Sequence, residues 1–352
     1  KGRHRGETGG RIDIASANIR VLGALIDASG AAGGGIVEIG GGLHGGGDLA
    51  HAQSVSIEST TVIRADALDS GNGGVVVAWS DGQTDAHGTF SARGGPNGGN
   101  GGTIETSGHS VDFTGIRVNA SATYGAAGTW LVDPTTLTID SAAATTIANT
   151  LNSGTSVTLQ TNPDGTTSGP GTASSGAGDI IFASGLFAPG GNNTTLTVQA
   201  YNNIVINGGG SYVSIAGSFV AQAGGSFTLN GSLFAKNVTI TTIGDMSFNG
   251  DLEPNPGTAT LTAGGSIYFG GSVNSLGGNP ILNAGGDIQI TGYVPDVLNS
   301  IVAKSKIEAD KTEPDTVKHP YNDCGGCGKY HKEIVYAGCG GPYMLLKDQI
   351  LG

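Results

Sequence analysis

The feature that most constrains this chain is a glycine-led segment that recurs in its second half. Its four clearest copies are Ala-Gly-Gly-Ser-Phe-Thr-Leu, Ile-Gly-Asp-Met-Ser-Phe, Ala-Gly-Gly-Ser-Ile-Tyr-Phe and Ala-Gly-Gly-Asp-Ile-Gln-Ile. The aligned glycines are Gly225, Gly244, Gly265 and Gly286, so one unit occupies about 20 residues. A nearly constant period of this length indicates a repeat architecture in which each unit packs on its neighbours.

Each copy has the pattern of a turn followed by a short strand. The turn falls at Gly-Gly or Gly-Asp, and apolar residues then alternate with Ser, Thr or Gln. Further strand-like pieces lie between copies, such as 232–235 and 237–240. Three short strands in about 20 residues describe one coil of a parallel β-helix, whose strands pair with the coils on either side. We predict this all-β fold, with an inward-facing core stack of Phe227, Phe248, Phe269 and Ile290.

The first hundred residues follow the same pattern with looser spacing. Gly-Gly precedes a strand-like run at 34–39, 73–77 and 101–106. We therefore predict irregular glycine-rich coils over 1–127 and regular coils over 128–293, about 12 to 15 coils in all. The glycine-rich run 94–102 is expected to be an exposed loop or tight turn, because a phosphate-binding loop needs a helix after it and a strand pattern follows here.

Composition excludes several other classes. Gly accounts for 65 of 352 residues, too many for a mainly helical chain. The formal net charge of −12 argues against nucleic acid as a partner. No apolar run approaches the length of a membrane-spanning helix. The chain begins at Lys1 without an initiating Met or signal peptide, which indicates a piece of a longer precursor.

One segment carries a family resemblance. Gly128-Thr-Trp-Leu-Val-Asp-Pro134, with the strand-like runs 137–139 and 155–161, resembles the passengers of two-partner secretion systems, such as filamentous haemagglutinin and the high-molecular-weight adhesins of Gram-negative bacteria. The resemblance covers about residues 9 to 293. It implies a right-handed β-helix that an outer-membrane β-barrel transporter exports to the cell surface, for adhesion or biofilm formation. The family's N-terminal secretion domain, with its Asn-Pro-Asn motifs, is not present.

The C-terminal region changes character after residue 293. Residues 294–310 are predicted to form a short amphipathic helix that caps the open end of the solenoid. Its apolar face consists of Val297, Leu298, Ile301 and Val302.

Residues 311–352 form a cysteine-containing tail. Its thiols, Cys324, Cys327 and Cys339, could close a disulfide loop, bind zinc with His331, or stay free. The spacing matches zinc sites poorly, so we favour a disulfide between Cys339 and either Cys324 or Cys327. The odd thiol is then left to anchor the chain or to link copies. No cofactor is predicted.

Other polar and aromatic residues are expected to be structural. Asp179, Asp245 and Asp287 occupy matching repeat positions and could form a catalytic carboxylate row, but Asp after Gly is a common turn residue. Trp130 is expected to mark a kink in the solenoid, although an aromatic ring could also stack on a sugar. His87 and His109 have no nucleophile or metal-ligand partner at a sequence spacing typical of a catalytic or metal site.

These observations favour an extracellular structural or adhesive passenger, and not an enzyme. Its expected partners are the transporter, other copies of the chain and host or matrix glycans. The alternative is a self-assembling subunit of an extracellular filament or sheath, in which tail cysteines link copies. A polysaccharide-degrading enzyme is a more distant third.

Overall fold

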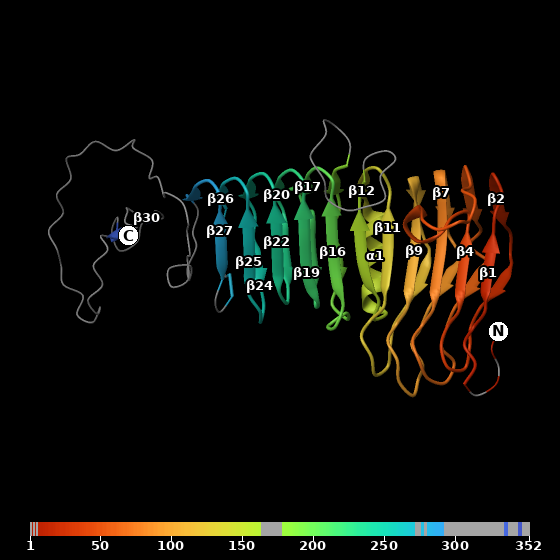
Figure 1. Ribbon diagram of the computed structural model, residues 1–352. Helices are drawn as coiled ribbons and strands as arrows, with labels where there is room; N and C mark the ends of the chain where they lie inside the picture. The colour runs from red at the N-terminus through yellow and green to blue at the C-terminus, as the bar shows by residue number, and fades with distance from the viewer. Residues whose placement is uncertain are drawn as a thin grey trace.

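The chain forms a rod of stacked coils (Figure 1). The computed structural model describes residues 6–162, 178–271 and 280–291, with Gly2, His4, Leu276, Gly277 and the backbone of 334–336 and 344–346. Four parallel sheets run along the rod, and β29 (Ile334–Tyr336) and β30 (Met344–Leu346) form a separate antiparallel pair. The predicted all-β parallel β-helix is confirmed.

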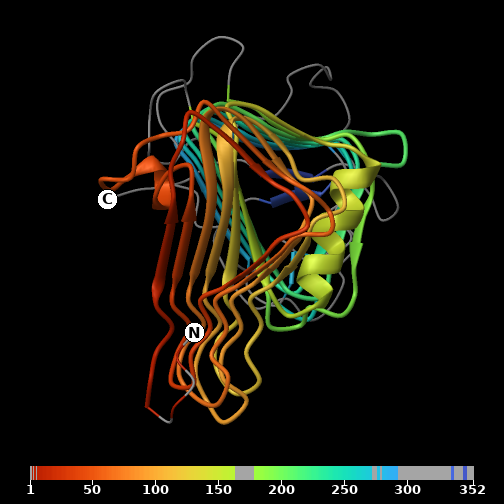
Figure 2. The same cartoon turned by 90° about the vertical axis from the view of Figure 1, so that its right-hand side faces the viewer.

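One long sheet extends along the whole rod, and three shorter sheets complete the coils (Figure 2). The long sheet contains β1 (Arg11–Ile14), β4 (Ile36–Ile39), β7 (Val75–Ala86), β9 (Thr103–Asp112), β11 (Thr129–Asp133), β13 (Ser156–Gln160), β16 (Thr195–Ala200), β19 (Ser218–Ala223), β22 (Val238–Thr242), β25 (Ala259–Ala263) and β27 (Ile281–Ala284), with β2 (Asn18–Val21) and β5 (Ser54–Ile57) off this path. The second contains β3 (Leu25–Asp27), β6 (Val62–Arg64), β8 (Thr89–Ser91) and β10 (Arg117–Asn119). The third contains β12 (Leu137–Ile139), β14 (Ile180–Phe182), β17 (Ile204–Ile206), β20 (Phe227–Leu229), β23 (Met246–Phe248), β26 (Ile267–Phe269) and β28 (Ile288–Ile290), and the fourth contains β15 (Leu186–Ala188), β18 (Tyr212–Ile215), β21 (Ser232–Ala235) and β24 (Leu252–Pro254).

Coil length changes along the rod. Near the N-terminus Arg11 pairs with Ile36, and Ile36 pairs with Val75. In a later coil, Val238 pairs with Ala259. The number of residues from one strand to its partner is therefore smaller in this later coil than in either early coil. The path from β1 to β27 consequently has eleven strands, and the expectation of 12 to 15 coils was too high because the early coils are long. The predicted division near residue 128 stays a prediction.

The additional residues of the early coils lie in two places, in longer strands and in longer loops. Strands β7 and β9 are long enough to continue past a register shift between Ser80 and Gln83, so that β7 pairs with β4 and then with β5. The glycine-rich loops between the second sheet and the long sheet add the rest, and they project beyond the outline of the later coils (Figure 2).

Gly-Gly pairs sit where the chain enters the long sheet in the early coils. At Gly73, a Cβ would lie 2.0 Å from the Ala92 carbonyl oxygen, and at Gly101 it would lie 1.8 Å from that of Ala120. Only glycine permits backbone segments to approach so closely. The run 94–102 belongs to this arrangement, because the N–H groups of Gly71 and Gly73 donate to the carbonyls of Gly98 and Asn100.

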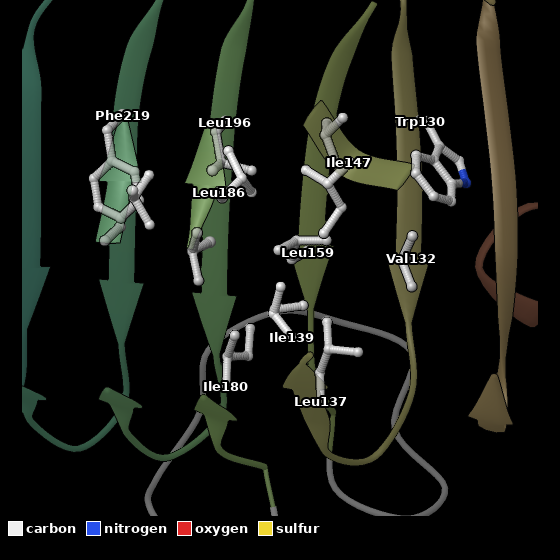
Figure 3. Packing of buried hydrophobic residues seen from close by; sticks show 14 of the residues in the cluster. Trp130, Val132, Leu137, Ile139, Ile147, Leu159, Ile180, Leu186, Leu196 and Phe219 are labelled. Atoms are coloured by element: carbon white, nitrogen blue, oxygen red, sulfur yellow. The ribbon is translucent and has the colours of Figure 1, made fainter. Parts of the chain in front are cut away.

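Helix α1 (Ser141–Asn152) was not predicted from the sequence. Asp140 caps its first turn by accepting from the N–H groups of Ala142 and Ala143 at 3.0 and 2.9 Å. Its buried face, which includes Ile147 and Leu151, packs beside β15, β10 and β13 at the side of the rod (Figures 2 and 3). In the described part of the chain, α1 is the one α-helix.

Inward-facing residues form one continuous apolar core between the sheets (Figure 3). Trp130 is fully buried in it, donates its indole N–H to Thr106 Oγ1 at 3.0 Å and meets Phe113 edge-on at 5.4 Å. A sugar therefore cannot reach this ring. Strand β11 ends at Asp133, directly before Pro134.

Candidate functional site on the outer face of the long sheet

The residues predicted to form the core stack lie in two neighbouring columns of the third sheet. Phe227 is the register partner of Met246, whereas Phe248 is followed by Phe269 and then by Ile290. The three phenylalanines are fully buried, and Ile290 is partly buried against the core. The rings of Phe248 and Phe269 stack with centroids 5.0 Å apart. The predicted cap residues 297–302 and the three cysteines lie outside the described residues.

The row of turn aspartates is part of a hydrogen-bond ladder. Asp179 accepts from the backbone N–H of Asn203 at 2.9 Å, and Asp245 accepts from that of Ser266 at 2.7 Å. The Ser266 hydroxyl in turn accepts from the N–H of Asp287 at 3.0 Å. These side chains hold successive turns in register, as the turn interpretation predicts.

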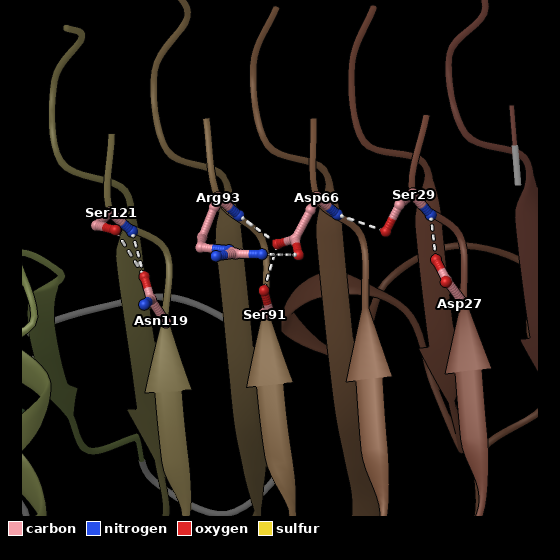
Figure 4. A network of polar contacts seen from close by, with 7 residues as sticks. All are labelled: Asp27, Ser29, Asp66, Ser91, Arg93, Asn119 and Ser121. Atoms are coloured by element: carbon pink, nitrogen blue, oxygen red, sulfur yellow. Dashed lines mark hydrogen bonds and ion pairs between the residues drawn. The ribbon is translucent and has the colours of Figure 1, made fainter. Parts of the chain in front are cut away.

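A second polar ladder joins the ends of the second-sheet strands (Figure 4). Asp66 is its centre: it is 2% exposed, pairs with Arg93 at 2.9 Å and accepts from the Arg93 backbone N–H at 2.8 Å. Ser91 donates to the same carboxylate. The N–H of Asp66 itself donates to Ser29 Oγ at 3.2 Å. Because every charge here has a partner, this ladder is structural.

A different arrangement occurs on the outer face of the long sheet, where acidic side chains are buried without basic partners. Glu105 on β9 faces away from the core, between the inward-facing Ile104 and Thr106, yet it has no exposed surface. One carboxylate oxygen, Oε2, accepts from the backbone N–H of His44 at 2.8 Å. His44 belongs to the 3-10 turn η1 (Leu43–Gly45), so the segment around η1 covers this part of the sheet.

Burial raises the pKa of Glu105 above its ordinary value, whereas the His44 N–H, the nearby Ser107 hydroxyl and the charge of His44 act in the opposite direction. The Glu38 carboxylate adds to the increase. Glu38 itself is paired with Arg11. In the described part of the chain, no ion pair with Lys, Arg or His includes Glu105.

Asp133 lies on the next strand of the long sheet. Its Oδ2 atom accepts from the side-chain amides of Gln160 at 3.1 Å and Asn162 at 2.7 Å. Burial, followed by the charge of Glu105, raises the pKa of Asp133 to about 7. Perturbed carboxyls of this kind are enriched at functional sites.

Four buried oxygen atoms of this region have no hydrogen-bond partner. They are Glu105 Oε1, Ser107 Oγ, Asp133 Oδ1 and Asn162 Oδ1, and we call these four residues the oxygen cluster. They account for all the buried side-chain polar atoms without a partner among the described residues. Because an unpaired buried oxygen costs free energy, their concentration at one place calls for an explanation.

Sequence reasoning missed this cluster, although a signal for it was present. In the four Gly-Gly copies of the early coils the fifth residue is Asp13, Glu38, Val77 or Glu105, and these four residues are register partners in successive strands. An acidic residue inside an otherwise apolar strand is unusual. What the sequence did not reveal is the segment around η1 that covers it.

Catalysis by the oxygen cluster has no geometric support. A carboxyl acting on a polysaccharide must touch the glycosidic bond, and Glu105 has no exposed surface. Among the described residues, no group of three or more His, Cys, Asp or Glu is placed to hold a metal, and no helix is long and apolar enough to cross a membrane. His87 contacts the carbonyl of Thr114 at 2.9 Å and lies 3.8 Å from Asp112.

A groove of about 730 Å³ lies between α1 and β10. Arg117, Asn119, Thr145 and Asn149 are among the residues that line it. Much of its polar surface is already used: Arg117 donates to Thr89 and to the Ser59 carbonyl, and Thr145 donates to the carbonyl of Ser141. The groove therefore offers few free polar groups to a ligand.

No protein-family model matches the sequence, and a search of curated proteins finds no significant match. The likeness to two-partner secretion passengers therefore rests on the sequence segments alone.

Proposed function

We propose that this chain is a structural segment of an extracellular bacterial surface adhesin, a β-helical passenger that displays adhesive surface at a distance from the cell. The observation that supports this proposal is the unbroken path of eleven parallel strands around one apolar core. Such a solenoid grows in length by adding coils, and neighbouring coils hold it stiff. Eleven strands at about 4.8 Å spacing span roughly 48 Å.

The outer face of the later coils suits recognition of uncharged partners. Gln199, Gln222 and Thr241 follow one another across the long sheet, and the amides of Gln199 and Gln222 are linked at 3.0 Å. Rows of amides and hydroxyls offer both donors and acceptors, which is what the hydroxyl groups of a glycan require. Host or matrix glycans are the partners we propose. Export through an outer-membrane β-barrel transporter belongs to the same proposal and rests on the family resemblance.

Electron microscopy of the native surface material tests this function. We expect single rods attached to cells, and binding of the purified full chain to a panel of glycans immobilised on an array. Replacing Gln199 and Gln222 together by Glu should reduce glycan binding while leaving the circular dichroism spectrum unchanged. Absence of the chain from the cell surface, or no binding to any immobilised glycan or matrix, would overturn the proposal.

The alternative, a self-assembling filament subunit, is favoured by one observation. Leu22 and Leu25 in the first coil are 54% and 65% exposed. Leu22 directly follows β2 and Leu25 begins β3, and in the described part of the chain each of these strands has a neighbouring strand on one side only. Exposed apolar residues beside an open strand edge promote pairing with another chain. Ordered filaments of one repeating protein in the same micrographs, lost on Leu25→Lys substitution, would establish this function instead.

A further inference from the structure

The oxygen cluster carries an inference beyond the proposed function, and its first basis is position. Ser107 on β9 is the register partner of Asp133 on β11, and Glu105 lies two residues before Ser107 on the same face. Asn162 reaches Asp133 from the next coil, where its amide donates to Oδ2 at 2.7 Å. The four side chains thus form one contiguous row over neighbouring coils.

The second basis is that these side chains are buried while one oxygen atom of each has no hydrogen-bond partner. Glu105 is 0% exposed, Ser107 is 1% exposed and Asn162 is 6% exposed. Each of them, and Asp133, contributes one oxygen atom that lacks a hydrogen-bond partner. Two of these residues, Ser107 and Asn162, are neutral, so the feature is not merely a group of acids. Buried oxygens of this kind normally bind hydrogen-bond donors or cations.

The third basis is charge. Ionised Glu105 and Asp133 bring two negative charges into a buried region, and in the described part of the chain no ion pair neutralises them. Arg11 on β1 of the same sheet pairs with Glu38 and Asp13 instead. A divalent cation would balance both charges.

We propose that Glu105, Ser107, Asp133 and Asn162 form a binding site for a calcium ion. Calcium takes six to eight oxygen ligands in flexible geometry, including carboxylates, amide carbonyls and waters. The four unpartnered oxygens supply about half of such a shell, and water or backbone carbonyls supply the rest. The set contains no nitrogen or sulfur ligand, which disfavours zinc, and magnesium demands a stricter octahedral arrangement. With ligands from β9, β11 and the residue two beyond β13, the ion joins three consecutive coils.

Calorimetric titration of the full chain with calcium chloride tests the site. The protein is first freed of metal with EGTA and dialysed, and the titration is repeated with magnesium chloride and at matched ionic strength with sodium chloride. We expect one calcium ion per chain and weaker binding of magnesium. Glu105→Gln and Asp133→Asn should each weaken calcium binding at least tenfold. Glu253→Gln, which removes a carboxyl on β24 outside the cluster, should leave binding unchanged.

Terbium luminescence provides a second measurement, which depends on how close the bound ion lies to a tryptophan ring. Trp79 on β7 is the register partner of Ser107, so a terbium ion in the site lies close to this indole ring and is sensitised by it. We expect emission on excitation of tryptophan, its displacement by excess calcium, and a large loss of emission in Trp79→Phe.

Several results would overturn the proposal. They are no calcium binding by the wild-type chain, equal binding by wild type and Asp133→Asn, or terbium emission that Trp79→Phe does not change. If Glu105→Gln fails to fold, Ser107→Ala provides the test, because it removes one ligand oxygen with little change in volume and should still weaken binding. Calcium binding is measured on the purified chain, so its failure leaves the adhesin proposal untouched, and failure of glycan binding leaves the calcium site untouched.

Discussion

At the scale of single residues, the outer-face carboxyls differ most from ordinary surface acids. A carboxyl on a solvated sheet face normally keeps an ordinary pKa, whereas burial raises the pKa of Asp133 from 3.8 to about 7. The folded chain therefore holds a proton that the unfolded chain releases at lower pH. Glu105, whose pKa is also raised by burial, acts in the same direction.

Raising the pH should consequently destabilise the metal-free chain. The contribution of Asp133 is fully present below about pH 4 and is lost as the pH rises through about 7, and the full shift corresponds to roughly 4 kcal/mol. Asp133→Asn removes this titration, so in EGTA its stability relative to wild type should increase between pH 5 and pH 8. Urea unfolding at both pH values measures the difference. A difference that stays constant, or that falls toward pH 8, would contradict the prediction; Glu253→Gln serves as the control.

The core stack allows a second prediction at this scale. Phe248 lies between Phe227 and Phe269, with ring centroids 5.8 and 5.0 Å away, and has no exposed surface. Phe248→Ala should lower the free energy of unfolding by about 3 to 5 kcal/mol, because it removes buried apolar area and leaves a cavity. Phe187→Ala is the matched control, since Phe187 is 57% exposed on β15. Equal losses in the two variants, measured by chemical denaturation, would show that Phe248 is not part of the core.

At the scale of elements, the Gly-Gly corners decide how the early coils enter the long sheet. At Gly73 an added Cβ would meet the Ala92 carbonyl oxygen at 2.0 Å and the Gly102 nitrogen at 2.6 Å. Both are backbone atoms of neighbouring coils and cannot move independently. The corner therefore tolerates no side chain.

Gly73→Ala should destabilise the chain by about 2 kcal/mol or more, because the backbone must shift to admit the methyl group. Gly10→Ala is the matched control: Gly10 also belongs to a Gly-Gly pair, and a Cβ there has nothing within 4 Å. Thermal unfolding of the two variants measures the contrast. A Gly73 variant as stable as the Gly10 variant would mean that the corners are not closely packed.

At the scale of the whole molecule, the described rod is held by contacts between neighbouring coils. The three cysteines lie outside the residues that the structure describes. Because solenoid stability is the sum of coil and interface contributions, a change outside these contacts should leave the rod folded. The tail is therefore expected to serve attachment rather than folding.

Replacing Cys324, Cys327 and Cys339 together by Ser tests this separation. The β-sheet signal in circular dichroism and the melting temperature should match those of the wild type, while the fraction retained on cells or in filaments should fall. Reductant added to wild-type chain should reproduce the loss of retention. Loss of β-structure would mean that the cysteines stabilise the fold, and unchanged retention would mean that the tail neither anchors nor links.

The repeat of the second half and its register could be predicted from the amino-acid sequence. The steps between the aligned glycines equal the steps between Phe227, Met246, Ile267 and Ile288, which are register partners. This was predictable because a period-two apolar pattern permits only one face to be buried, and a one-residue slip would expose it. The strands that follow Gly-Gly in the early coils were predictable for the same reason. Helix α1 was missed, although Ala144, Ile147, Ala148 and Leu151 have helical spacing after the capping Asp140.

The composition of the oxygen cluster, in contrast, follows from contacts that the sequence pattern does not contain. Glu105, Ser107 and Asp133 alternate with core residues along their strands, a pattern that predicts a solvated outer face. Their burial depends partly on the segment around η1, which lies far before Glu105 in the sequence and returns over β9 through the His44 N–H. A local pattern specifies which face of a strand points inward. It does not specify which distant segment covers the other face, because that depends on contacts between coils that exist only once the chain is wound.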